Sequence, residues 1–285
     1  MAPTIFELDR LFSSTQTRAF LFSVATGATG SVKDRVARAM FDSAESLGLL
    51  AARTQIVEPT SGAEGIALAS EAAKRGRKLT IVAPEYIEKK NLELLKKLGA
   101  TVELTPAKLG MSGAVSAAQK ICSDEPDVWS PNLFENPANP GIHETTTAPD
   151  LWKLLDGNLD AFVCAAGSGG TFMGIARFLK RKNSLIQRLV VEPKESPVLS
   201  GGKPGKHAIV GIGAGFVPKI LDPSVPTGVV TVSSEEAREW SDRLAKTEGI
   251  LAGVSTGANL AAVAKLANLP EYRGKTIVTI AFDRG

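Results

Sequence analysis

Short apolar runs alternate with longer amphipathic segments along almost the whole chain, and this alternation limits the possible folds more than any other feature. The apolar runs have the length of strands, and turns rich in glycine, serine and threonine separate them from segments with apolar residues at helical spacing. Strands that alternate with helices pair mainly in parallel, and the helices cover both faces of the sheet. The sequence therefore predicts an α/β protein built from mainly parallel, twisted sheets flanked by helices.

The turn at residues 165–171 is the most glycine-rich of these junctions, with glycine at three of the four positions 167–170. It follows an apolar run at 160–164, which predicts a buried strand, and it precedes an amphipathic segment. Glycine has no Cβ, so backbone N–H groups can approach an anion closely, and the N-terminus of the next helix adds its positive dipole end. The turn predicts a phosphate site, with the Ser168 and Thr171 hydroxyls as further donors. A tight turn without a ligand is the alternative.

Lys33 is the second candidate residue, because it lies in the first turn of a helix predicted over residues 31–47. Ser31 is expected to cap this helix and Gly48 to end it. A lysine in the first turn is unfavourably placed, since cations prefer the other end of a helix. Either Lys33 is a surface lysine, or its amine has a chemical role.

Three further segments resemble loops that carry function in α/β proteins. Residues 59–65 form a polar turn after a predicted strand, and residues 253–258 form a glycine-containing turn before a helix predicted over 259–267. The segment 196–216 is rich in glycine and too irregular for a simple turn, and loops of this length are usually functional or disordered. In a parallel sheet, ligands bind at the carboxyl ends of strands, where such turns lie.

Composition excludes several classes of function. The 285 residues are 44% hydrophobic and 22% charged, and the net charge of +3 comes from 33 basic and 30 acidic residues that are scattered along the chain. We therefore expect no nucleic-acid-binding surface, and no apolar run has the length to cross a membrane. Cys122 and Cys164 provide no disulfide framework and no metal site, which favours a reducing, cytoplasmic compartment. His143 and His207 lie near no nucleophile motif, which argues against triad or metal-dependent hydrolysis.

Seven motifs in a fixed order resemble one enzyme family. They lie at residues 31–35, 58–62, 134–140, 167–171, 192–205, 211–216 and 253–257. Together they are similar to cysteine synthase (O-acetylserine sulfhydrylase), a member of the fold type II group of pyridoxal 5′-phosphate (PLP) enzymes that also holds cystathionine β-synthase. The resemblance implies two α/β lobes, as in the β-subunit of tryptophan synthase. We expect a larger lobe of residues 1–27 and 137–285 with the phosphate turn, and a smaller lobe of residues 28–136 with Lys33 at the cleft.

The resemblance also implies a role for each turn. Lys33 would form the Schiff base with the cofactor aldehyde and move the α-proton of the substrate, and Ser255 would hydrogen-bond the pyridine nitrogen. The cofactor phosphate would be bound by Gly167, Ser168, Gly169, Gly170 and Thr171. The substrate α-carboxylate would be bound by Thr60, Ser61, Gly62, Ala63 and Glu64. The implied reaction is β-elimination and β-replacement on an O-activated serine, such as O-acetylserine with sulfide.

The substrate turn departs from the family pattern at two positions. The family sequence is Thr-Ser-Gly-Asn-Thr-Gly, and this chain has Ala63 and Glu64 in place of the asparagine and the second threonine. Ala63 cannot make the hydrogen bond of the asparagine to the cofactor ring oxygen, a loss of about 0.5–1.5 kcal/mol. An ionised Glu64 about 4 Å from the substrate carboxylate would repel it by roughly 4 kcal/mol at an effective dielectric of about 20.

Three hypotheses account for these departures. The first is a PLP enzyme with altered specificity, whose substrate has a basic group that pairs with Glu64. The second is a catalytically impaired protein that binds PLP or a partner, because the cleft in this family also receives the C-terminus of serine acetyltransferase. The third is an ordinary cysteine synthase with Glu64 turned into solvent. The resemblance further implies a homodimer.

Overall fold

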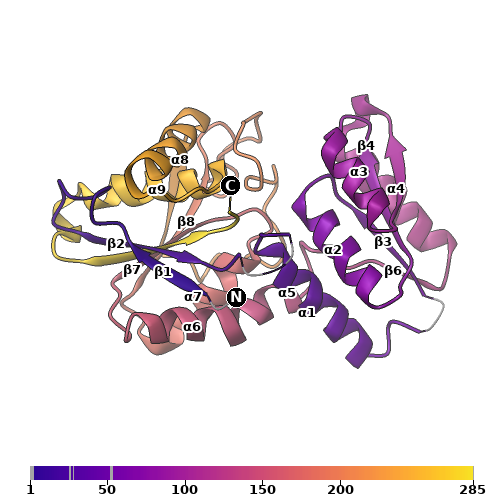
Figure 1. Ribbon diagram of the computed structural model, residues 1–285, viewed down its shortest axis with the longest axis horizontal. Helices are drawn as coiled ribbons and strands as arrows, with labels where there is room; N and C mark the ends of the chain where they lie inside the picture. Colours follow the sequence, from indigo (N-terminus) through magenta and orange to yellow (C-terminus); the bar gives the residue numbers. More distant parts are fainter. Residues whose placement is uncertain (1–2, 26, 28, 52–53, 285) are drawn as a thin grey trace. The chain divides into compact units, whose positions relative to one another are not determined.

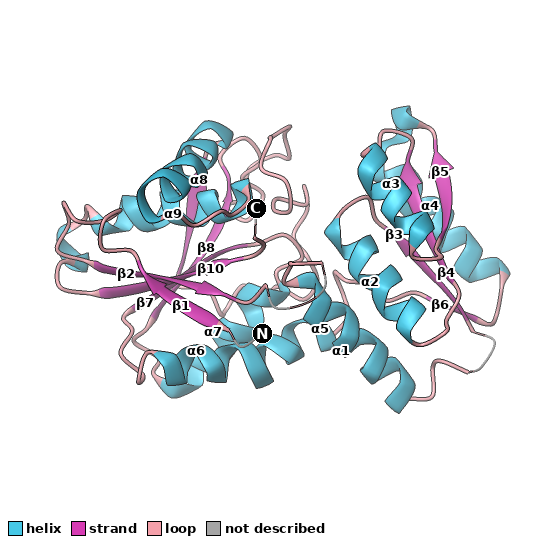
Figure 2. Ribbon diagram, viewed as in Figure 1, coloured by secondary structure: helices cyan, strands magenta, loops and turns pink. Residues whose placement is uncertain are grey.

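The computed structural model describes residues 3–25, 27, 29–51 and 54–284. The chain forms two compact units, a larger one of residues 1–26 and 139–285 and a smaller one of residues 27–138. Each unit has its own sheet with helices packed against it (Figures 1 and 2), which confirms the α/β prediction.

The larger unit contains a sheet of six strands. In spatial order these are β1 (Thr4–Glu7), β2 (Arg18–Ser23), β10 (Thr276–Ala281), β7 (Ala161–Ala165), β8 (Gln187–Pro193) and β9 (Gly228–Val232). Only β1 is antiparallel to its neighbour, and all other pairs are parallel. Every residue of β7 and β10 is buried, as expected for central strands covered on both faces. Because β7, β8 and β10 are parallel neighbours, their carboxyl ends lie at one edge of the sheet.

Helices and short helical turns connect the strands of the larger unit. They are α5 (Ala138–Ile142), which begins at the unit boundary, α6 (Ala148–Leu154), α7 (Gly170–Lys182), α8 (Ser234–Glu248) and α9 (Val254–Ala267), with a π-helical turn at His143–Thr147 and a 3-10 turn at Pro270–Tyr272. Helix α9 is apolar and buried on nearly all sides, which is typical of a helix in the middle of a core. Its residues Leu260 and Val263 pack in one cluster with Val163 and Ile277 of the sheet.

The smaller unit contains a four-stranded sheet in which all pairs are parallel. In spatial order its strands are β5 (Thr101–Thr105), β4 (Leu79–Pro84), β3 (Gln55–Pro59) and β6 (Val128–Trp129). Its helices are α1 (Lys33–Ser46), α2 (Ala63–Lys74), α3 (Lys89–Lys97) and α4 (Gly110–Asp124), with a 3-10 turn at Ala107–Leu109. Val57 and Val82 of the sheet pack against Ala114 and Ala118 of α4.

All of these helices are short, and the longest have 15 residues. Within the part of the chain that the structure describes, none has both the length and the apolar character to cross a bilayer.

Two local predictions are wrong, and one helical segment was not predicted. The helix expected from residue 259 begins at Val254, so Ser255 lies in its first turn rather than in a preceding loop. Ser31 does not cap α1, because the cap position is Val32, and the Ser31 Oγ instead accepts a hydrogen bond of 3.3 Å from the Lys33 backbone N–H. Residues 138–147, for which the sequence predicts no element, are helical.

Candidate functional site

The glycine turn at residues 167–170 connects β7 directly to α7, as the sequence predicts. Gly169 has φ +85°, in the left-handed region that glycine adopts without strain. A Cβ at position 167 would overlap the carbonyl oxygen of Gly211, and one at position 170 would overlap the side chain of Asn139. Close packing therefore requires glycine at both positions. The turn ends at the N-terminus of a 13-residue helix, where backbone N–H groups and the dipole favour an anion.

Two buried side chains from the helical segment 138–147 fix the hydroxyls of this turn. The Asn139 amide donates to Ser168 Oγ at 3.1 Å, and His143 Nε2 lies 3.3 Å from Thr171 Oγ1. His143 Nδ1 lies 2.9 Å from Thr147 Oγ1, which orients the ring. Asn139 is 1% exposed and His143 is fully buried. Their segment includes a π-helical turn, a feature that often occurs at functional sites.

Sequence reasoning missed both residues as part of the site. Asn139 lies inside the motif at 134–140, so its position in the motif was a usable signal. Nothing in the sequence around His143 connects it with Thr171, because the contact joins segments 28 residues apart.

Ser255 lies at the same edge of the larger unit's sheet as the glycine turn. Asn259, one turn further along α9, accepts a hydrogen bond of 2.7 Å from the Ala165 N–H at the end of β7 and donates one of 2.9 Å to the Ile280 carbonyl of β10. Residues i and i+4 share one face of a helix, so Ser255 lies on the face that meets these strand ends. The fully buried Asn259 holds this arrangement, and the sequence analysis did not single it out.

The long loop at 196–216 is anchored at this edge as well. The buried Glu192 carboxylate, near the end of β8, accepts hydrogen bonds from the Leu199 and Ser200 N–H groups and from the Ser200 hydroxyl. Gly167 and Glu192 line a small hollow together with Leu199 and Gly213 of the loop. The loop is thus ordered against the end of the sheet beside the glycine turn.

In the smaller unit, Lys33 is the first residue of α1. Burial of its amine lowers its pKa from the ordinary value, and the nearby Glu64 carboxyl opposes this shift. A lowered pKa increases the fraction of neutral amine, which is the nucleophilic form.

The turn at residues 60–62 connects β3 to α2 and places the first residues of α2 beside Lys33. Thr60 Oγ1 accepts a long hydrogen bond of 3.5 Å from the Gly62 N–H, and the Asn91 amide donates to the Ser61 carbonyl at 3.3 Å. A Cβ on Gly65 would lie 2.9 Å from Thr60 Cγ2, so glycine permits the close approach of the helix to the turn. The 12-residue α2 has its N-terminus here, which favours an anion.

Glu64 is buried in the first turn of α2, and only 9% of it is exposed. The hypothesis that it turns into solvent is therefore wrong. Burial, and next the charge of Glu58, raise the pKa of the Glu64 carboxyl well above its ordinary value, while the Lys33 cation lowers it. Within the described part of the chain, Oε1 of Glu64 is buried without a hydrogen-bond partner.

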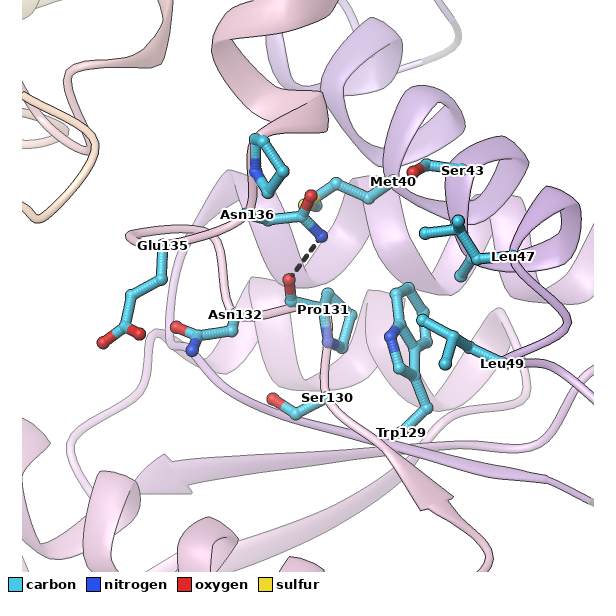
Figure 3. Close-up of a pocket in the computed structure, with 12 residues that line it drawn as sticks. Met40, Ser43, Leu47, Leu49, Trp129, Ser130, Pro131, Asn132, Glu135 and Asn136 are labelled. Atoms are coloured by element: carbon cyan, nitrogen blue, oxygen red, sulfur yellow. Dashed lines mark hydrogen bonds between the residues drawn. The ribbon is translucent and has the colours of Figure 1, made fainter.

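The predicted site residues thus form two groups, one in each unit. The turn at 167–171 and Ser255 lie together in the larger unit, and Lys33 and the turn at 60–64 lie together in the smaller unit. The smaller unit also has a pocket of about 250 Å³ that none of these residues lines. Figure 3 shows Leu47 and Leu49 beside Trp129 in this pocket, with the Asn136 amide donating to the Pro131 carbonyl at 2.8 Å.

The chain is similar to known proteins over almost its whole length. The family model for pyridoxal-phosphate dependent enzymes matches residues 3–283. A cysteine synthase from Staphylococcus aureus is 43% identical over 258 residues, which are 90% of this chain and 82% of that protein. The crystal structure of a cysteine synthase from Entamoeba histolytica has a TM-score of 0.96 at 34% identity and covers 100% of this chain and 86% of its own.

An O-acetylserine dependent cystathionine β-synthase from Helicobacter pylori is also similar in structure, with a TM-score of 0.89 at 37% identity over 99% of this chain and 92% of that one. Two findings establish the family of this chain. The family model matches nearly the whole chain, and the sequence is 43% identical to a cysteine synthase. The chain belongs to the family of pyridoxal-phosphate dependent enzymes, as a cysteine synthase-like enzyme that uses PLP as its cofactor.

Proposed function

We propose that the chain catalyses β-elimination and β-replacement on an O-activated serine, with O-acetylserine as the amino-acid substrate and sulfide as the incoming nucleophile. The observation that carries the proposal is the pairing in the smaller unit of Lys33, whose amine has a lowered pKa, with the N-terminus of α2. An amine whose lowered pKa increases its neutral fraction and an anion-binding helix end are what a PLP enzyme needs to handle an amino acid.

The residues of the larger unit fit a bound PLP. The turn at 167–171 offers backbone N–H groups packed too closely for any side chain at positions 167 and 170, together with the Ser168 and Thr171 hydroxyls. We assign the phosphate to this turn. We assign the pyridine nitrogen to Ser255, because a neutral hydroxyl leaves that nitrogen largely unprotonated, which suits β-elimination rather than transamination.

Lys33 carries the covalent and proton-transfer roles. When bound, PLP withdraws electrons from the α-carbon of the substrate and so makes its α-hydrogen acidic. With PLP bound, Lys33 would hold the cofactor through a covalent bond between its Nζ and the aldehyde carbon, formed with loss of water. Once released from that bond, the Lys33 Nζ would be the group that accepts the proton from the substrate α-carbon. The turn at 60–64 holds the substrate α-carboxylate and so keeps the α-hydrogen within reach of that amine.

We further propose a homodimer, on the resemblance to the family, and a partner role for the C-terminus of serine acetyltransferase. A cytoplasmic location is proposed because Cys122 and Cys164 are both free thiols. Gel filtration tests the first proposal, and titration with a synthetic acetyltransferase C-terminal peptide tests the second.

The main test is an assay of the purified chain with PLP, O-acetylserine and sulfide. We expect the visible absorbance of the bound cofactor to change when O-acetylserine is added, and cysteine to accumulate when sulfide follows. A coloured protein that responds to no amino acid would support the alternative of a binding module. A protein that stays colourless after addition of PLP would contradict the roles assigned to Lys33 and to the turn at 167–171.

A further inference from the structure

Glu64 combines two properties that rarely occur together in a stable fold. It is nine-tenths buried, and its Oε1 has no hydrogen-bond partner among the residues that the structure describes. Buried polar atoms are almost always paired, because an unpaired one keeps the full cost of leaving water. The unpaired Oε1 of Glu64 lies at the N-terminus of α2, beside Lys33. This position indicates that the oxygen forms a hydrogen bond only when a ligand is bound.

A second buried carboxyl group, that of Glu58 on β3, lies close enough to act on Glu64 electrostatically. Its Oε2 accepts hydrogen bonds from Ser130 Oγ at 3.0 Å and from the Asn132 N–H at 2.9 Å, and its Oε1 accepts one of 3.3 Å from the Leu133 N–H. Burial raises the pKa of Glu58 overall, and these three donors oppose that rise, whereas the pKa of Glu64 is raised well above its ordinary value. Glu58 is thus the member of the pair that is equipped to carry a negative charge.

The charged groups of the smaller unit that act on Glu64 are Glu58 from β3 and Lys33 from α1. Two buried carboxylates near each other do not both ionise readily, because like charges repel strongly at low dielectric. Since Glu58 has the hydrogen-bond donors and Glu64 Oε1 has none, the proton belongs on Glu64. A protonated carboxyl group has an O–H to donate.

We infer that Glu64 binds substrate as a neutral carboxylic acid, and that its O–H donates a hydrogen bond to the α-carboxylate of the amino acid at the N-terminus of α2. The inference rests on the proposed function, because it requires an amino-acid substrate at this turn. It removes the repulsion expected from an ionised Glu64, since the neutral acid attracts a carboxylate. Glu64 is then a substrate-binding residue whose protonation determines how tightly the carboxylate is held.

The test measures binding to the holoenzyme rather than turnover. L-alanine carries an α-carboxylate and no leaving group on its β-carbon, and L-alaninamide lacks the carboxylate, so the visible absorbance of the cofactor reports the binding of each. Wild type and Glu64→Gln are titrated with both ligands from about pH 6 to about pH 9. Ionisation of the ligand affects both proteins equally, so it drops out of the ratio of their affinities at each pH.

We expect Glu64→Gln to bind L-alanine nearly as tightly as wild type at the lowest pH, because the amide also donates. The ratio should then move in favour of Glu64→Gln as the pH rises, since ionisation of Glu64 removes the donor from wild type alone. Glu64→Ala, which has no donor, should bind L-alanine about tenfold to a hundredfold more weakly than wild type at the lowest pH. Affinity for L-alaninamide should be the same in all three proteins.

Three results would overturn the inference. An affinity ratio that does not vary with pH would show that Glu64 does not change protonation at the site. Much tighter L-alanine binding by Glu64→Gln at every pH would show an ionised, repelling Glu64. A preference for L-lysine over L-alanine that is lost in Glu64→Gln would show that the residue pairs with a cationic side chain.

Controls keep the inference separate from the proposed function. Glu93→Gln removes an exposed glutamate of α3 and should behave as wild type. If Glu64→Gln fails to fold, Glu64→Thr keeps an O–H donor that does not ionise, and its affinity ratio to wild type should change with pH in the same direction. If wild type shows no absorbance change with any amino acid, the proposed function fails; if it responds and the ratio is flat, only the inference about Glu64 fails.

Discussion

The two turns assigned to ligands, residues 167–171 and 60–64, differ in how completely they are hydrogen-bonded. In the first, Asn139 and His143 contact the two hydroxyls, and both partners are buried. In the second, Thr60 makes a long hydrogen bond of 3.5 Å, and Oε1 of Glu64 is buried with no hydrogen-bond partner in residues 3–25, 27, 29–51 or 54–284.

This difference suggests two ways of preparing a binding site. A turn whose hydroxyls are already fixed loses little conformational freedom when an anion binds, which suits a cofactor that stays bound. A turn with an unpaired buried acid is costly without a ligand and gains a hydrogen bond when one arrives, which suits a substrate that comes and goes. The predictions below test this contrast, in order of decreasing effect.

Replacement of Lys33 by alanine should have the largest effect. Removal of the amine eliminates both the covalent link to the cofactor and the group that moves the α-proton, so cysteine formation should fall by about 10²- to 10⁴-fold or more. Steady-state assays and the visible spectrum measure both losses. Lys89→Ala is the matched control, because Lys89 is also the first residue of a helix and is exposed. Equal activity of the two variants would remove Lys33 from the mechanism.

Gly170→Ala should have the second-largest effect, because the added Cβ would overlap the Asn139 side chain. We expect a loss of about 1–3 kcal/mol in the free energy of unfolding and weaker PLP binding, since the turn or Asn139 must shift. Gly141→Ala is the control, because a Cβ there meets no atom within 4 Å. Denaturant unfolding and PLP titration provide the measurements. A fully stable Gly170→Ala protein with normal PLP affinity would contradict the close packing assigned to this turn.

Asn139→Ala removes the amide that donates to Ser168 Oγ and should cost about 1–3 kcal/mol in PLP binding and folding together. If the amide positions the phosphate turn, affinity should fall for PLP and stay unchanged for pyridoxal, which has no phosphate. Asn158→Ala, at an exposed asparagine of the same unit, should change neither affinity. Equal losses for both ligands would mean that Asn139 supports the fold alone.

Glu64→Gln should have the smallest effect, a change in how stability depends on pH. The pKa of Glu64 is raised in the folded protein, mainly by burial, so the folded state holds a proton that the unfolded state releases. Between the unfolded and folded pKa values, wild-type stability should therefore fall as the pH rises, by at most about 1.4 kcal/mol per pH unit. Glu64→Gln lacks this contribution, so its stability relative to wild type should increase with pH.

Chemical unfolding of both apoproteins at a series of pH values from about pH 5 to about pH 7 measures this difference. A parallel pH dependence would mean that Glu64 titrates normally, and the contrast between the two turns would then lose its electrostatic basis.

Local patterns were sufficient to predict the fold class, the strand before the glycine turn and the turn itself. The strand expected at 160–164 is β7, within one residue, and the turn after it leads directly to α7. Helix starts were less predictable, because glycine, serine and threonine can end a turn or begin a helix. The sequence therefore predicts a loop at Ser255 and Thr256. In the structure both residues lie in the first turn of α9, which is buried in the core. The side chains that support the turns, Asn139, His143 and Asn259, left little or no sequence signal.

By itself, the sequence determined the α/β fold and the family, because hydrophobic period and glycine spacing are properties of neighbouring residues. It also showed that Glu64 breaks the family pattern, but not what that carboxyl group does. Only the tertiary structure decided that Glu64 is buried beside Lys33 and Glu58, with one oxygen unpaired. The reason is physical: protonation depends on burial and on charges brought together from β3, α1 and α2, and these distances are created by folding and are not encoded in any one segment.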